Sequence, residues 1–170
     1  YFVGNSQLGV ATFDFNVEGQ GFIKETLNTE VIGDVYSINF NNYDYQNLKV
    51  SGILKEQLFD GLLVSNDDNI KFTFKGLADF SDEENNFNFI ADIEYADLQK
   101  LNFIKDSISI FKGNVNMDIA GNTLDNIKGD IKFSKTSYQN KNDIYFFDDF
   151  KISSSFDADN LRSIEINSPD

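Results

Sequence analysis

The side chains that most often carry enzyme chemistry are scarce in this chain. It contains no His and no Cys, which removes Ser-His-Asp and Cys-His catalysis, cysteine nucleophiles and nearly all zinc chemistry. Ser109 and Lys112 have the spacing of a Ser-x-x-Lys nucleophile. That motif needs a helix to bring the lysine back beside the serine, whereas both residues here fall in an alternating, strand-like run. We therefore interpret the pair as structural.

Acidic residues are so abundant that each one is a weak signal. With 28 Asp and Glu in the chain, some pair must lie at the separation of a glycosidase site by chance. A loop that starts at Asp157 lacks the central Gly and the final Glu of a calcium-binding loop, and the loop at residues 67–69 fits no better. We interpret both loops as solvated turns. We expect no catalytic residue, no metal, no cofactor and no enzymatic activity.

Composition narrows the function classes further. The 170 residues include 14 basic and 28 acidic side chains, a formal net charge of −14, which argues against binding to nucleic acid or to anionic membranes. Apolar residues make up 41% of the chain, with 18 Phe and 7 Tyr, so it is not expected to be disordered. No signal peptide or membrane span is visible, and we expect both ends to be cut from a longer chain.

Alternation of apolar and polar residues is the main structural signal. It is clearest between residues 107 and 133, where Val115, Met117 and Ile119 are followed, after a turn, by Ile131 and Phe133. Such alternation is typical of β-strands with one apolar and one polar face. The chain is thus predicted to be all-β, with an irregular lead-in at residues 1–8 and strands near residues 9–18, 26–41, 46–55, 58–65, 70–80, 87–95, 107–120, 124–137, 143–156 and 161–167.

One segment departs from this pattern. Leu98 and Leu101 lie at helical spacing behind Asp97, a residue type that caps helices. We predict a short helix at residues 96–104, most simply as a connector.

The strand pattern occurs twice in the same order. Residues 9–19 match 113–121, residues 33–35 match 129–131, residues 43–51 match 145–153, and residues 62–66 match 163–167, at offsets of 104, 96, 102 and 101. Such a repeat favours a stacked or extended β architecture. We predict a first β-groove repeat at residues 1–95, a helical connector at 96–106, and a second, truncated repeat at 107–170.

The apolar faces of these strands are compatible with two architectures. In a β-sandwich, the faces of two sheets meet in a closed core. In an open, curved sheet, one face forms a hydrophobic trough for acyl chains or for an unfolded strand. Periodicity alone favours the sandwich but does not separate the two.

Several segments resemble a known family. Residues 113–133, 136–140 and 145–150 are similar to the TamB branch of the AsmA-like proteins, most closely the translocation and assembly module of Bacteroidota, and residues 95–101 and 164–170 fit the same picture. The resemblance implies a long periplasmic protein anchored in the inner membrane. Its strands would build a taco-shaped groove reaching toward an outer-membrane barrel of the TamA/BamA class. Members are implicated in moving phospholipid between membranes and in assembling outer-membrane proteins.

With this resemblance, we expect a curved antiparallel or mixed sheet that forms a hydrophobic groove (a β-taco) with one short helix. The cargo would be phospholipid or an unfolded β-strand, and no nucleic acid would bind. A β-sandwich acting as a secreted binding or adhesin module is the alternative. The predicted groove lining consists of Phe13, Phe15, Ile38, Phe40, Phe72, Phe74, Phe87, Phe89, Met117, Ile119, Ile131, Phe133, Ile152, Ile164 and Ile166.

Overall fold

The computed structural model describes residues 8–21, 23, 26–80, 83–105, 108–122 and 125–168. In these residues the chain forms a single sheet of eleven strands. The strands are β1 (Leu8–Gln20), β2 (Asn28–Phe40), β3 (Tyr43–Lys55), β4 (Leu58–Asn66), β5 (Ile70–Asp79), β6 (Asn86–Asp97), β7 (Ile110–Ala120), β8 (Lys128–Gln139), β9 (Ile144–Phe147), β10 (Phe150–Phe156) and β11 (Arg162–Asn167).

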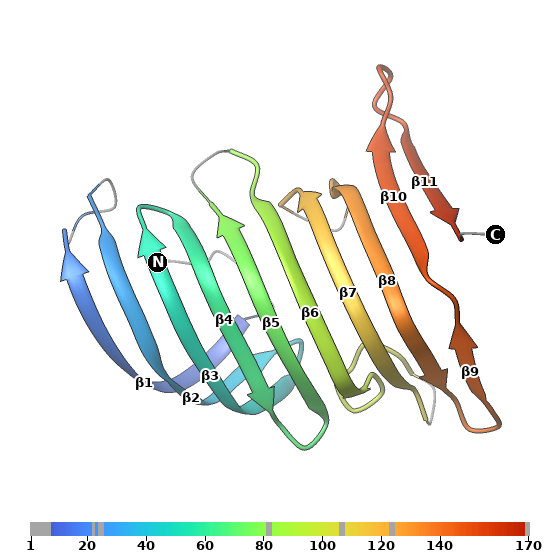
Figure 1. Ribbon diagram of the computed structural model, residues 1–170, viewed down its shortest axis with the longest axis horizontal. Helices are drawn as coiled ribbons and strands as arrows, with labels where there is room; N and C mark the ends of the chain where they lie inside the picture. The colour runs from blue at the N-terminus through green and yellow to red at the C-terminus, as the bar shows by residue number, and fades with distance from the viewer. Residues whose placement is uncertain are drawn as a thin grey trace.

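The strands follow one another as an antiparallel meander. They pair in the order β1-β2-β3-β4-β5-β6-β7-β8-β10-β11, and β9 pairs with β8 beside β10. Figure 1 shows them side by side as one curved layer, with β1 to β3 bending sharply at one end. The prediction of an all-β protein with an open, curved sheet is confirmed. Within the described residues there is no second sheet, so the sandwich alternative does not hold.

The predicted short helix at residues 96–104 is wrong. Leu101 N–H does donate to the Asp97 carbonyl at 3.0 Å, and Asp97 Oδ1 accepts from the Lys100 N–H at 3.2 Å. The turn stops there because Asn102 adopts a left-handed φ of 64°. The next two N–H groups then both return to the Leu98 carbonyl, which is how a helix terminates. The segment is therefore a sequence of turns closed at its C-terminal side.

Several sequence predictions fall partly outside the described residues. They are the lead-in at residues 1–7, the strand and connector ends at residues 106, 107 and 124, and the last two positions, 169 and 170. The strand predicted at residues 143–156 is interrupted, because β9 ends at Phe147 and β10 begins at Phe150.

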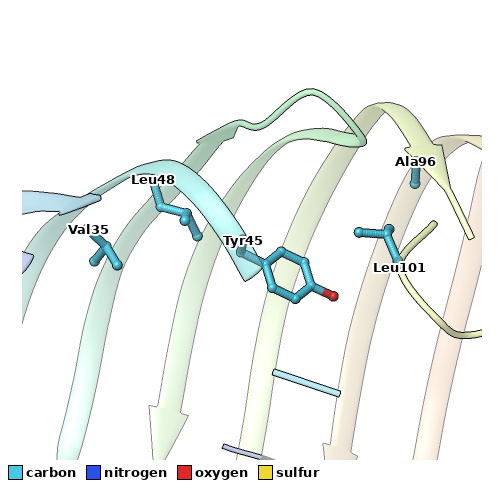
Figure 2. Close-up of a cluster of buried hydrophobic side chains, with 5 residues drawn as sticks. All are labelled: Val35, Tyr45, Leu48, Ala96 and Leu101. Atoms are coloured by element: carbon cyan, nitrogen blue, oxygen red, sulfur yellow. The ribbon is translucent and has the colours of Figure 1, made fainter. Parts of the chain in front are cut away.

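The bend at one end of the sheet brings distant strands together over the same face. Val35 on β2 and Tyr45 and Leu48 on β3 form a buried cluster with Ala96 at the end of β6 and Leu101 in the following turn. Figure 2 shows the Tyr45 ring extending across the sheet toward Ala96 and Leu101. Strands β3 and β6 are three positions apart in the sheet, so this contact requires the sheet to be concave on the side of these residues.

The strand pairs of the two halves match more closely than the sequence offsets indicate. Phe13 opposes Val35 and Val35 opposes Leu48, just as Val115 opposes Phe133 and Phe133 opposes Phe150. Asn47, whose left-handed φ produces a bulge in β3, corresponds in the second half to the gap between β9 and β10. The structural offset is therefore 102 residues between β1 and β7, 98 between β2 and β8, and 102 between β3 and β10. Between β4 and β11, where Leu63 corresponds to Ile166, it is 103 residues. Because β6 also pairs directly with β7, the two predicted repeats form one continuous sheet.

Candidate functional site

One face of the sheet carries a nearly unbroken row of apolar side chains, which we call the apolar face. Directly opposed residues on neighbouring antiparallel strands project from the same side. One such row reads Phe15, Gly33, Val50, Leu63, Phe74, Ala91, Val115, Phe133 and Phe150. The next row reads Val17, Val31, Gly52, Gly61, Gly76, Phe89, Met117, Ile131, Ile152 and Ile166.

The registers put all fifteen predicted lining residues on this face. Most of them are half-buried, because they pack against neighbours in the same layer. The exceptions lie on the two edge strands: Phe13 on β1 is 56% exposed, and Ile164 and Ile166 on β11 are 57% and 69% exposed. Among the described residues no second layer covers this face, so their half-burial leaves a broad apolar surface in contact with solvent. Contiguous apolar patches of this kind are typical of interaction sites.

Aromatic contacts tie the strands together along this surface. The rings of Phe74 on β5 and Phe89 on β6 have centroids 4.1 Å apart, and those of Phe133 on β8 and Phe150 on β10 stack at 4.6 Å with 9° between their planes. Cross-strand aromatic pairs of this kind stabilise a sheet beyond their area burial. The face is thus ordered without a covering layer.

Glycines leave room in the middle of the apolar face. Gly52, Gly61 and Gly76 oppose one another on β3, β4 and β5. A Cβ at Gly61 would lie 2.5 Å from the Phe59 ring and also 2.5 Å from the Ser51 carbonyl oxygen. The Phe59 ring therefore occupies space that a side chain at Gly61 would need, and it keeps the surface apolar there.

One end of the apolar face is closed by the turn at residues 97–105. Leu101 is completely buried against the bent strands. Asn102 Nδ2 donates to the carbonyls of Asn41 and Asn42 at 3.2 and 3.0 Å, and Asn41 Nδ2 donates to the Asn102 carbonyl at 3.2 Å. We call these bonds between the β2–β3 turn and the β6–β7 connection the asparagine clasp. It fixes the curl of β2 and β3 over the face.

A polar cluster lies beside the asparagine clasp, where a solvated turn was predicted. Asp67 is only 2% exposed, so that interpretation of residues 67–69 is wrong for this side chain. Its carboxylate accepts hydrogen bonds from the Tyr43 hydroxyl at 2.6 Å and from the N–H groups of Gln46 and Asn69 at 2.8 Å each. Burial, followed by the bond to Asp67, raises the pKa of Tyr43 to about 12.

The opposite face is mixed: it carries most of the charged residues of the strands, but also Ile32, Ile53 and Ile90, which are 51%, 52% and 59% exposed. Lys128 pairs with Glu84 at 2.7 Å. Asp130 accepts a bond from the Ser153 hydroxyl at 2.7 Å and lies 3.4 Å from Lys151, and these two contacts lower the pKa of its carboxyl group. A hollow of about 620 Å³ has a mixed lining, in which Ile90 and Phe150 lie beside Asn116 and Lys132. The apolar face is by contrast an open surface.

The candidate chemical residues do not assemble a reactive site. Ser109 is buried and accepts a bond from the Tyr138 hydroxyl at 3.2 Å, whereas Lys112 is exposed on β7. Asp157 Oδ1 accepts from the N–H groups of Asp159 and Leu161 at 2.9 Å, so it stabilises its own turn. The described ranges contain no group of three or more acidic residues that could hold a metal ion. Nor does any helix in this part of the chain have the length and hydropathy to cross a membrane.

Sequence reasoning missed the most buried part of the apolar face. Val35 and Ile38 both point to this face although they are three residues apart, and so do Tyr45 and Leu48. The left-handed Asn47, with φ of 55°, shifts the alternation by one residue. An Asn in the middle of a strand pattern was the available signal for this bulge.

Comparison of the chain with family models, with curated proteins and with solved structures yields no match. The similarity to the TamB branch therefore stays a hypothesis that rests on the segments quoted above.

Proposed function

We propose that this chain is a lipid-binding segment of a TamB-like bridge, whose apolar face holds the acyl chains of phospholipid during transfer between the inner and outer membranes. The observation that supports it most is the apolar row from Phe15 to Phe150, which runs across the sheet with no covering layer among the described residues. Strands spaced about 4.8 Å apart make a row of this length roughly 40 Å long. One leaflet of a bilayer core is about 15 Å thick, so the row exceeds the length of one acyl chain.

The energetics favour reversible binding. Full burial of a methylene group contributes about 0.8 kcal/mol. An open sheet covers an acyl chain from one side, so about half of that value applies for each methylene. Binding of this strength lets a chain slide along the face and leave it, and no covalent step is required. Positions paired across the face carry uncharged side chains except Arg162 on the edge strand β11.

Under this proposal the parent protein is periplasmic and anchored in the inner membrane, and its other end meets a barrel of the TamA/BamA class. An unfolded β-strand is the second cargo that the same face would accept, because it also presents alternating apolar side chains. The adhesin alternative relied on a closed sandwich core, and the open sheet gives that reading no support.

Photo-crosslinking tests the proposal with neighbours on the same strand. A photoreactive residue at Phe74 or Phe89 lies on the apolar face, and one at Thr73 or Asn88 lies on the opposite face. With phospholipid vesicles, we expect lipid adducts from the first pair and none from the second. Mass spectrometry of organic extracts identifies the lipid. Equal labelling of both faces, or no adduct at Phe74 and Phe89 in a folded protein, would rule out the apolar face as the lipid site.

A matched pair of substitutions tests binding without a label. Phe74→Asp places a charge in the centre of the apolar face, and Thr73→Asp places the same charge on the opposite face of β5. We expect only Phe74→Asp to abolish lipid capture while both variants keep the far-ultraviolet circular dichroism of a β protein. Lipid capture by Phe74→Asp at the level of Thr73→Asp would contradict the proposal.

A further inference from the structure

One position interrupts the uncharged character of the apolar face. Among the described residues that are paired across this face, Arg162 on β11 is the only one with a charge. It opposes Phe156 on β10, and Ile164, the next residue of β11 on the same face, opposes Ser154. Since the chain has a formal net charge of −14, this cation is a local positive site on an acidic protein.

The match between the two halves of the sheet indicates that the fold does not require a charge at this position. By the offsets given above, Arg162 takes the place of Phe59 on β4, and Ser154 takes the place of Gly52 on β3. In the first half, a Cβ at Gly52 would lie 3.0 Å from the Phe59 ring. The second half thus has a guanidinium beside a hydroxyl where the first half has an aromatic ring beside a glycine. The same strand geometry accepts an apolar side chain there, so the charge needs another explanation.

Hydrogen bonds position the guanidinium group on the face. Arg162 Nε donates to Ser154 Oγ at 3.0 Å, and Ser154 Oγ donates to the Ile127 carbonyl at 2.8 Å. Asp157 begins the hairpin turn beside this site, but its Oδ1 accepts from two backbone N–H groups of that turn at 2.9 Å each. A guanidinium binds a phosphate group through parallel N–H···O bonds that lie in its plane. The bond from Nε restricts the orientation of that plane.

We propose that Arg162, positioned by Ser154, binds the phosphate of a phospholipid whose acyl chains lie on the apolar face. The inference rests on the proposed lipid-binding function and adds a headgroup site to it. Phe156, which opposes Arg162, and Phe150 lie at the two ends of β10 on this face. At about 3.3 Å per residue, they are about 20 Å apart along the strand. An acyl chain extends about 15 Å, so a lipid with its phosphate at Arg162 covers most of this distance.

The surroundings of Arg162 favour a phosphate that is attached to apolar chains over a free anion. Ile164 and Ile166, on the same face of β11, are 57% and 69% exposed. Acyl chains would cover these side chains favourably, whereas a hydrated anion would leave them in water. A guanidinium is also more weakly hydrated than an ammonium group, so it suits a charged site beside apolar residues. The site uses the face of β10 and β11 and not their edges.

The test uses the whole chain and two soluble short-chain lipids, a phosphatidylcholine and the diacylglycerol with the same acyl chains. Calorimetric titration gives the ratio of the two affinities, which isolates the contribution of the headgroup. We expect this ratio to be about tenfold lower in Arg162→Gln than in the parent protein, with the affinity for diacylglycerol unchanged. Added salt should lower the ratio of the parent and leave that of Arg162→Gln unchanged.

Two further variants separate the site from general effects. Ser154→Ala should lower the ratio by a smaller factor, because the guanidinium remains but is no longer positioned. The matched control is Lys132→Gln, because Lys132 is exposed on the opposite face of β8 and its loss changes the net charge equally. We expect this control to keep the ratio of the parent protein.

The outcomes distinguish failure of the headgroup site from failure of the proposed function. The same ratio in Arg162→Gln and the parent, with diacylglycerol still bound, would overturn only the headgroup site. A folded parent protein that binds neither lipid would overturn the proposed function and this inference with it.

Other occupants would also be recognised. An equal decrease of the ratio in Lys132→Gln would indicate an effect of net charge and overturn the site. Loss of the ratio in excess inorganic phosphate would assign Arg162 to a free anion, and a dimer of the parent that Arg162→Gln dissociates would assign it to a second copy of the chain. An uncharged peptide of alternating apolar residues whose binding falls equally in Arg162→Gln would assign it to an unfolded strand. Each of these results would overturn the proposal.

Discussion

Replacing Asp67 with Asn should destabilise the protein more than any other single-atom change at the closed end of the sheet. Asp67 Oδ1 accepts from the Tyr43 hydroxyl and the Asn69 N–H, and Oδ2 accepts from the Gln46 N–H. In Asp67→Asn, one oxygen can keep the first two bonds, but the new amide nitrogen is a donor that faces the Gln46 N–H. One charge-assisted bond, worth about 1.5–3 kcal/mol, is lost, and a partly buried donor is left unsatisfied.

The expected decrease in the free energy of unfolding is therefore about 3 kcal/mol, measured by urea denaturation with an unchanged m-value. Tyr43→Phe should cost about 1.5 kcal/mol alone and less in the Asp67→Asn background, because the bond from Tyr43 then ends on a neutral amide oxygen and is no longer charge-assisted. A loss below about 1 kcal/mol for Asp67→Asn, or an equal cost of Tyr43→Phe in both backgrounds, would refute this account of the cluster.

Three further predictions concern the same end of the sheet. Because the folded-state pKa of Tyr43 lies near 12, above its usual 10, its contribution is complete below pH 10 and lost between pH 10 and 12. Urea denaturation at a series of pH values between 10 and 12 should therefore show a smaller decrease in the free energy of unfolding for Tyr43→Phe than for the parent protein. Asn102→Ala should cost about 1 kcal/mol more than Asn102→Gly, since glycine tolerates the φ of 64° and both variants lose the clasp bonds. Thr136→Val should raise the free energy of unfolding by up to about 1 kcal/mol, because the buried Thr136 hydroxyl has no hydrogen-bond partner among the described residues.

Each of these has an outcome that would contradict it. Equal alkaline destabilisation of both proteins would show that Tyr43 ionises as an ordinary tyrosine. Equal stability of the alanine and glycine variants at position 102 would mean that backbone strain is not the cause. Destabilisation by Thr136→Val would indicate that the hydroxyl of Thr136 makes a bond after all.

The strands and the side of the apolar face could be predicted because both depend on a local period of two residues. Phe72 and Phe74, or Met117 and Ile119, lie on one face whatever their neighbours are, so alternation alone assigns them. The choice between one open sheet and two packed sheets could not be predicted from this pattern, because both architectures bury the same side of each strand.

The predictions of a helix at residues 96–104 and of a solvated turn at residues 67–69 were wrong for two reasons. In the first, one residue changes the backbone conformation, and in the second, the hydrogen-bond partners are distant in sequence. Asn102 ends the helical turn after Leu101 by adopting a left-handed conformation. The burial of Asp67 depends on Tyr43 and Gln46, which are 24 and 21 residues away. A carboxylate in a loop reads as solvated until the long-range donors that satisfy it are known.

The structure gathers one cluster of buried groups at the closed end of the sheet, apart from the half-buried residues that would bind a ligand. Buried side chains such as Leu101 and Asp67 gather at the closed end with the asparagine clasp, and the Asp67 carboxylate is satisfied there by its hydrogen bonds. Along the rest of the sheet most apolar residues stay half-buried, although Ala91 and Val115 are buried, and among the described residues only neighbours in the same layer cover them. A ligand that covered them would bind the folded state alone and so stabilise it. Substitutions at the closed end should therefore change the free energy of unfolding and leave lipid capture intact in the folded fraction. Phe74→Asp should abolish lipid capture in the folded fraction as well as lower the free energy of unfolding, because it also removes the ring contact with Phe89.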